Sequence, residues 1–139
     1  MVYKNCGGTI AVRMDRGEDI LEKLEEIALS ENIMFASVTA IGAVDEFEAG
    51  AYDLRKKEYR KKLYRGSYEI VSLCGNITSK DGKPYLHLHI ACSDETGETI
   101  GGHLTKARVS VTCEMFIVSV PNKTGRIADE QTGINIMEL

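Results

Sequence analysis

The sequence predicts an α+β fold: a mainly antiparallel β-sheet with one principal amphipathic helix at about residues 18–31. Only that segment carries apolar residues at helical spacing. The rest of the chain is divided into short runs rich in β-branched and alternating apolar residues, bounded by glycines and turn pairs. The length of 139 residues, with 43% hydrophobic residues, suits a single domain spanning 1–139.

The helix follows a strand-like run, Gly8–Met14, and opens with acidic residues at Glu18 and Asp19, where the helix dipole favours negative charge. Its apolar residues share one face, while glutamates and a lysine occupy the other. The apolar set is Ile20, Leu21, Leu24, Ile27 and Ala28. This pattern indicates a helix packed against a sheet.

The segments after Asn32 have strand character. Arg65-Gly66 is expected to turn a hairpin between two of them, and Asp81-Gly82 is a strong turn signal. The expected strands are Ile33–Ile41, Val44–Asp53, Lys57–Tyr64, Ser67–Cys74, Tyr85–Cys92, Val109–Val120 and Ile134–Leu139. The run Val109–Val120 is apolar on both faces and therefore needs cover on both sides, which one helix cannot supply.

Composition excludes several classes of protein. The formal net charge of -4 argues against a wholly basic nucleic-acid coat. No apolar run is long enough to span a membrane, so no membrane partner is expected. The four cysteines show no Cys-x-x-Cys spacing, and we expect free thiols in a cytoplasmic protein. No phosphate-binding glycine loop or Gly-x-Ser-x-Gly elbow occurs, and no catalytic residue is identified.

The three histidines of the chain are the candidate metal ligands. His87 and His89 are one residue apart on an expected strand, so both rings project from the same face, opposite Leu88 and its apolar neighbours. His103 follows Gly101-Gly102, where the missing Cβ atoms permit a close backbone approach. Three imidazoles suit zinc or another divalent transition metal with one coordination position left open.

Alternatives to this metal site stay open. Two histidines on one strand face are also found as hydrogen-bonded polar groups without a metal, and the Gly-Gly-His segment favours the shared site over this alternative. Cys92 is expected to point away from the histidine face, and Glu114 is a remote candidate for a fourth ligand.

A basic segment is the candidate contact for DNA. Residues 55–65 hold seven basic residues and one acid, which sum to a local charge of +6. The basic residues are Arg55, Lys56, Lys57, Arg60, Lys61, Lys62 and Arg65. With Tyr59 and Tyr64 among them they could contact phosphates and stack on bases, giving weak, non-specific binding. The alternative is a solvated edge hairpin whose lysines discourage aggregation.

Two short motifs resemble the signature of the plant and prokaryote conserved (PPC or PCC) domain. They are Leu86-His87-Leu88-His89-Ile90 and Ile100-Gly101-Gly102-His103-Leu104. Further pieces that resemble the family are Arg16–Ile20, Ala40–Val44, Tyr68–Ile77 and Thr132–Ile134. The resemblance covers nearly the whole chain.

The resemblance implies a trimer of α+β domains. In plants the domain is joined to AT-hook segments that bind DNA, and bacterial members are considered DNA-binding on that basis. This chain has no Arg-Gly-Arg-Pro hook. The family fold is similar to that of acetolactate decarboxylase, whose zinc is held by three histidines, and this supports a metal role for His87, His89 and His103.

Three hypotheses follow from the sequence. The first is a homotrimeric PPC-domain protein with a DNA-binding or regulatory role and a three-histidine metal site. The second is a small zinc-dependent enzyme or ligand-binding protein whose substrate the sequence does not name. The third is a metal-free oligomerisation module.

Overall fold

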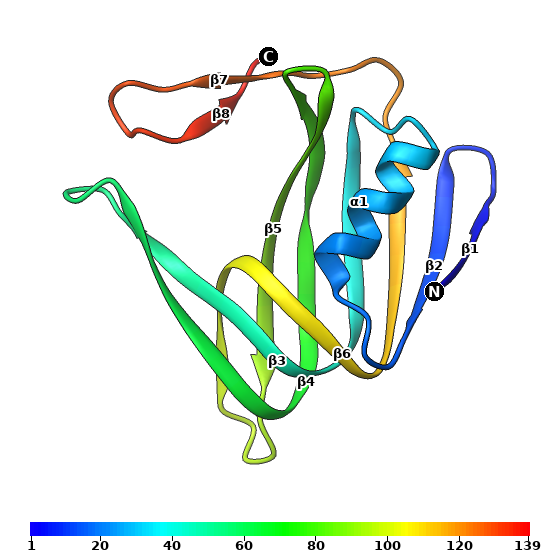
Figure 1. Ribbon diagram of the computed structural model, residues 1–139, viewed down its shortest axis with the longest axis vertical. Coiled ribbons are helices and arrows are strands. Elements are labelled where there is room, and N and C mark those ends of the chain that lie inside the picture. Colours follow the sequence, from blue (N-terminus) through cyan, green and yellow to red (C-terminus); the bar gives the residue numbers. More distant parts are fainter.

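One helix and eight strands make up the chain, and the computed structural model describes all residues 1–139 (Figure 1). In chain order they are β1 Val2–Asn5, β2 Thr9–Asp15, α1 Ile20–Ser30, β3 Ala36–Asp53, β4 Glu58–Lys80, β5 Lys83–Ser93, β6 Thr99–Ser119, β7 Arg126–Ala128 and β8 Asn135–Met137. The α+β class is confirmed. No helix is long and apolar enough to cross a membrane.

The first six strands form one antiparallel sheet in the order β1-β2-β6-β3-β4-β5. Strand β6 also pairs with β5, so the sheet curls until β3, β4, β5 and β6 close on themselves. This closure brings the C-terminal half of β5, His89–Ser93, next to the start of β6, although β6 also lies beside β3. The two strands that carry the histidines therefore become direct neighbours.

Helix α1 covers the inner face of this sheet, as predicted. Asp19 caps its N-terminus, because its Oδ1 accepts hydrogen bonds from the backbone N–H groups of Leu21 (2.9 Å) and Glu22 (3.1 Å). The buried residues of the helix are Ile20, Leu24, Ile27 and Ala28. They join a single core of 26 buried residues, and the helix lies against β5 and β6.

Strands β3 and β4 run past the sheet and form a two-stranded arm (Figure 1). The arm turns at residues 54–57, where Asp53 Oδ1 accepts hydrogen bonds from the backbone of Arg55 (3.0 Å) and Lys56 (3.2 Å). The hairpin expected at Arg65-Gly66 is wrong. Gly66, with φ +146°, instead lies within β4, opposite a register shift in β3 where β3 still pairs with β6, so β4 has a bulge here and does not end.

The last two strands form a hairpin that folds back toward the arm. Strand β7 pairs with β8, and the preceding segment is held to β4 by a hydrogen bond from Ser79 N to Thr124 O (2.9 Å). Two contacts tie the hairpin to the arm: Tyr52 donates its hydroxyl proton to Thr132 O (2.6 Å), and Lys57 Nζ donates to Glu130 O (2.8 Å). The arm and the hairpin therefore enclose a space between them.

The outer face of the sheet carries large apolar side chains that nothing covers. On β6, Cys113, Met115 and Ile117 are buried under the helix, while Phe116 and Val118 alternate with them and are 53% and 45% exposed. Ile41, Val71 and Val111 are exposed as well. Strand β6 is apolar on both faces, as the sequence predicts, and the protein chain covers only one of them.

Candidate metal centre

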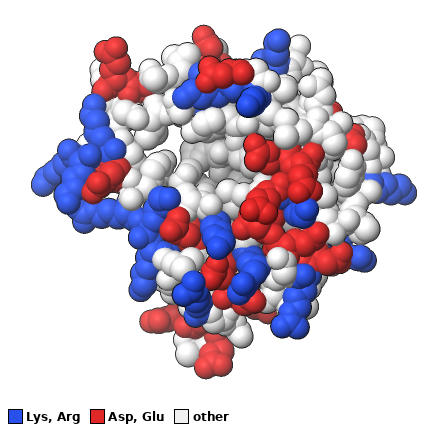
Figure 2. Space-filling view, in the orientation of Figure 1, with Lys and Arg blue, Asp and Glu red and all other residues white.

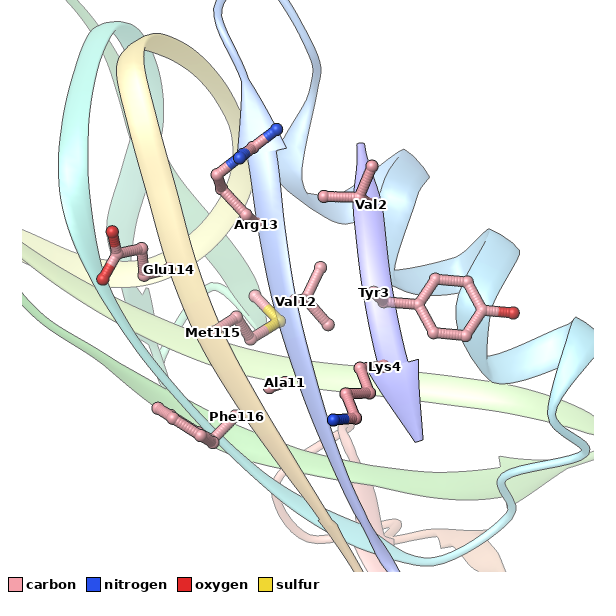
Figure 3. Close-up of a pocket in the computed structure, with 9 residues that line it drawn as sticks. All are labelled: Val2, Tyr3, Lys4, Ala11, Val12, Arg13, Glu114, Met115 and Phe116. Carbon is pink, nitrogen blue, oxygen red and sulfur yellow. The ribbon is translucent and has the colours of Figure 1, made fainter. Parts of the chain in front are cut away.

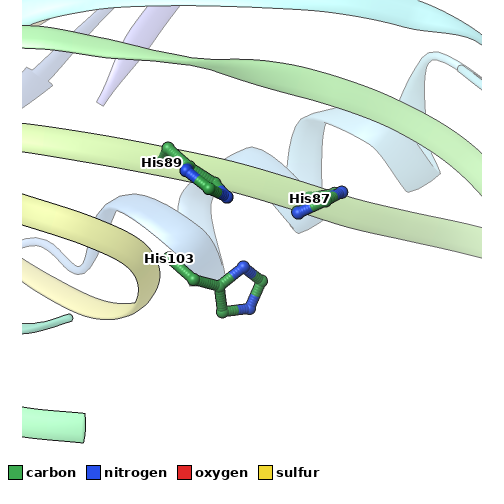
Figure 4. Close-up of side chains that lie close together, drawn as sticks. All are labelled: His87, His89 and His103. Atoms are coloured by element: carbon green, nitrogen blue, oxygen red, sulfur yellow. The ribbon is translucent and has the colours of Figure 1, made fainter. Parts of the chain in front are cut away.

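Three histidines from two adjacent strands converge on one point (Figure 4). His87 and His89 project from the same face of β5, while Leu88 and Ile90 alternate with them and enter the core. His103 lies directly opposite His89 in the β5–β6 register. One ring nitrogen of each histidine lies within 4.8 Å of those of the other two. The structure thus brings together the three residues that the sequence singled out.

Gly101 and Gly102 allow this convergence. A Cβ at Gly101 would lie 2.1 Å from Ile90 O, and a Cβ at Gly102 would lie 2.6 Å from Gly50 O. Gly102 also adopts a φ of +153°. Only residues without a Cβ let β6 pass between β5 and β3 at this distance, and the next residue is His103.

The histidines are suited to be neutral ligands. Burial, followed by the charges of the nearby His87 and His89, lowers the pKa of His103 to about 4. Burial is also the main cause that lowers the pKa of His87, followed by the charge of Arg126. Nδ1 of His103 is buried and has no hydrogen-bond partner. An unpartnered buried nitrogen is costly unless something binds it, and a metal ion fits that requirement.

The other candidate ligands lie elsewhere. Cys92 is fully buried on the opposite face of β5, and burial raises the pKa of its thiol to about 12. Glu114, the remote candidate for a fourth ligand, lies on the outer face of the sheet beside Phe116 and is wrong as a ligand to this cluster (Figure 3). The apolar groove drawn there has a volume of about 350 Å³ and includes no histidine.

A pocket of about 250 Å³ adjoins the histidine cluster. It lies between the arm and the β7–β8 hairpin, where Figure 2 shows the molecule hollowed. Tyr59 of the arm stacks on His103 with the ring centroids 4.3 Å apart, and Arg126 Nη2 lies 3.3 Å from His87 Nδ1. Tyr85 lines the pocket from β5.

The sequence interpretation missed Tyr85 and Arg126 as pocket residues and considered Tyr59 only as part of the basic segment. One signal was available for Tyr85, because residues 85, 87 and 89 alternate on one strand and therefore share a face. Nothing in the sequence connects Arg126 with the histidines.

The basic segment lies on the arm, where Figure 2 shows Lys and Arg side chains gathered with acidic groups among them. Three of its cations are paired with carboxylates of β3: Arg60 with Asp53, Lys61 with Glu48 (3.1 Å) and Arg65 with Glu46 (2.8 Å). Lys62 lies over the ring of Tyr64. The local charge is therefore partly neutralised by the neighbouring strand.

Comparison with known proteins places this geometry in a family. The family model of the Plants and Prokaryotes Conserved (PCC) domain matches residues 1–121, and the chain belongs to this family. No functionally curated protein matches the chain significantly.

Solved structures agree with this assignment. A metal-containing protein from Archaeoglobus fulgidus is 38% identical, with a TM-score of 0.89 over 100% of this chain and 99% of that one. A protein from Bacteroides thetaiotaomicron, named as a candidate DNA-binding protein, is 28% identical, with a TM-score of 0.95 over 99% and 96% of the two chains. Acetolactate decarboxylase from Bacillus subtilis subspecies spizizenii shares the fold alone, with 17% identity and a TM-score of 0.60 over 84% of this chain and 54% of that one.

Proposed function

We propose that this PCC-domain protein binds a divalent transition metal, zinc first, through His87, His89 and His103. The observation that carries the proposal is the convergence of three imidazoles around a buried, unpartnered Nδ1 of His103. The similarity to a protein named as metal-containing supports it. An all-imidazole donor set suits zinc, copper, nickel or iron better than calcium or magnesium.

The surroundings of the three histidines keep their rings able to bind a metal ion. Burial lowers the pKa of both His87 and His103, which favours the neutral imidazole, the form that can bind a metal ion. Tyr59 fixes the ring of His103 by stacking on it. When bound, a three-coordinated metal supplies an open Lewis-acid position, and the adjoining pocket gives a small molecule access to it. We therefore interpret the centre as a ligand-binding site, and we propose separately that the protein has a regulatory role in the cytoplasm.

The test is metal analysis of protein purified without a histidine tag and dialysed against equimolar zinc. We expect one zinc per chain, measured by mass spectrometry of the metal. The variant H103Q should bind zinc at least about tenfold more weakly, because it removes one of only three ligands. The control C6S removes an exposed thiol in the turn between β1 and β2, away from the cluster, and should retain wild-type binding. Zinc binding that survives H103Q unchanged would overturn the proposal.

DNA binding is a second candidate function, supported by the exposed basic arm and by the similarity to a protein named as a candidate DNA-binding protein. We propose that such binding is weak and not sequence-specific, with the seven basic residues of segment 55–65 as contacts. The ion pairs to β3 support weak DNA binding. Cations that are already paired with carboxylates neutralise fewer phosphates, so fewer counterions are released from the DNA.

We also propose that the protein assembles as a homotrimer. The family resemblance supplies the number three. The uncovered apolar side chains of the outer sheet face supply the physical reason, since such a patch is stabilised by contact with another subunit.

A further inference from the structure

The pocket beside the histidines holds a cation that lacks an anionic partner. Arg126 opens strand β7, and its guanidinium is held by three neutral acceptors. Nε donates to Thr78 Oγ1 (2.9 Å), Nη1 to Asn135 O (2.8 Å) and Nη2 to Asn76 Oδ1 (2.8 Å). No carboxylate lies within 4.0 Å of it, in contrast to the arginines of the basic arm that pair with Asp53 and Glu46.

The position of Arg126 is fixed before any ligand arrives. Its three hydrogen bonds connect β7 to β4 and β8, and its guanidinium lies 4.9 Å from the centroid of the Tyr85 ring. A guanidinium has five N–H groups. Three go to neutral acceptors and one approaches His87 Nδ1 at 3.3 Å, which leaves one N–H of Nη1 unused. A preorganised cation with an unused donor is an anion-binding group.

The walls of the pocket limit the size and character of the anion. The volume of about 250 Å³ admits a small molecule only. Three tyrosines, Tyr52, Tyr59 and Tyr85, line it, and their rings favour a ligand with a carbon skeleton over a bare inorganic ion. The lining contains one carboxylate, Glu58, and two cations, Lys57 and Arg126, so its formal charge is positive.

We propose that this pocket binds a small organic carboxylate, with Arg126 as the residue that recognises the carboxylate group. The inference deepens the proposed function and rests on it in one respect, because the open position of the metal would provide the second anchor of the ligand. Arg126 is then a specificity-determining residue. It lies on β7, so the residue pattern of β5 and β6 that places the histidines gives no indication of it.

The experiment measures carboxylate binding and zinc binding separately. Zinc-loaded wild-type protein is titrated by calorimetry with lactate, benzoate and inorganic phosphate in a carboxylate-free buffer, and zinc content is measured on the same samples. The variant R126Q keeps a planar, hydrogen-bonding side chain but removes the charge. The control R16Q removes the same charge from an exposed arginine outside the pocket.

We expect wild-type protein and R16Q to bind at least one of the carboxylates more tightly than phosphate. R126Q should retain zinc and bind that carboxylate about 10- to 100-fold more weakly, the range for loss of a charge-assisted hydrogen bond. If R126Q fails to fold, R126K serves instead. It keeps the charge but loses the planar fork, and it should bind the carboxylate more weakly than wild type.

The outcomes distinguish the two proposals. Zinc binding without carboxylate binding, tighter binding of phosphate, or full carboxylate affinity in R126Q or R126K would overturn the carboxylate inference and leave the metal site intact. Carboxylate binding that depends on Arg126 in a protein that does not bind zinc would support the inference and overturn the metal proposal. Loss of both would overturn both.

Discussion

At the scale of single residues, the chain holds its charged groups in two different ways. Glu46 is nearly buried between two cations, with Oε1 2.7 Å from Lys106 Nζ and Oε2 2.8 Å from Arg65 Nε. Arg126 is fixed by neutral acceptors alone. The first arrangement links β3, β4 and β6 and is structural, whereas the second leaves charge available for a ligand.

Glu46 gives a prediction about pH. Hydrogen bonds from Lys106 and Arg65 lower the pKa of Glu46 from its usual 4.5 to about 2. Because the folded pKa lies below the unfolded one, its ion pairs stabilise the protein fully above about pH 4.5, and this contribution is lost as the pH falls toward 2. E46Q should therefore lower the urea midpoint at pH 7, and the difference from wild type should shrink below pH 4.

The matched control is E25Q, which removes an exposed carboxylate of α1 that takes part in no ion pair. Its urea midpoint should follow that of wild type at each pH. A constant difference between E46Q and wild type from pH 7 to pH 3 would show that the carboxylate charge is not what stabilises this position.

At the scale of elements, the approach of β6 to β5 and β3 is what forms the histidine cluster. G102A should destabilise the protein, because the new Cβ would meet Gly50 O at 2.6 Å and the backbone strain alone costs about 1–3 kcal/mol. It should also weaken zinc binding, since His103 is the next residue. Thermal unfolding and zinc titration measure the two effects.

G97A is the control for this prediction. Gly97 also has a positive φ, of +87°, but a Cβ there would meet nothing within 4 Å. G97A should therefore lose only the stability that backbone strain costs, with no steric clash, and should retain wild-type zinc binding. Equal stability losses in G102A and G97A would contradict the account of the close approach.

The arm gives a prediction for DNA. Replacing Lys56, Lys57, Lys61 and Lys62 together by glutamine should abolish the weak binding of wild-type protein in gel shifts at low salt, because it removes phosphate contacts. A control that replaces Lys4, Lys23, Lys83 and Lys123 removes the same charge elsewhere and should bind nearly as wild type does. Tight binding that persists at high salt, or in the arm variant, would show that another surface contacts DNA.

Local patterns account for the features that the sequence predicted. The period of two in a strand places His87 and His89 on one face without knowledge of the rest of the chain, and two glycines before His103 indicate a close approach. Asp19 and the apolar spacing after it predict α1 for the same reason, since capping and helical periodicity act over a few residues.

Local patterns do not predict features that depend on contacts between segments far apart in the sequence. Arg65-Gly66 has the composition of a turn, yet β3 pairs with β4 on both sides of it and holds the strand continuous. Arg126 reaches the pocket only because β7 folds back beside Thr78 and Asn76 of β4. Both results are set by tertiary contacts that override local preference.

At the scale of the whole molecule, the outer sheet face predicts self-association. F116D should convert the proposed trimer into monomers, because it places a charge among exposed apolar side chains that would be buried between subunits. The control L29D changes an apolar residue of similar exposure on α1, 56% against 53%, and should stay trimeric. Light scattering at micromolar concentration gives the mass, and a wild-type monomer would contradict the proposal.

Assembly also bears on the charge that DNA would meet. A trimer carries a formal charge of -12, three times -4, and three copies of the basic arm. The overall charge repels DNA at long range, while the three arms add avidity at short range. Weak, salt-sensitive binding is the expected balance.

The central claim is that three histidines hold one metal ion, and X-ray absorption spectroscopy at the zinc edge of the loaded, untagged protein tests it most directly. We predict three imidazole nitrogens at about 2.0–2.1 Å and a further light atom from water or a bound anion. A zinc environment that contains sulfur, or fewer than three imidazoles, would place the ion outside this cluster and contradict the account.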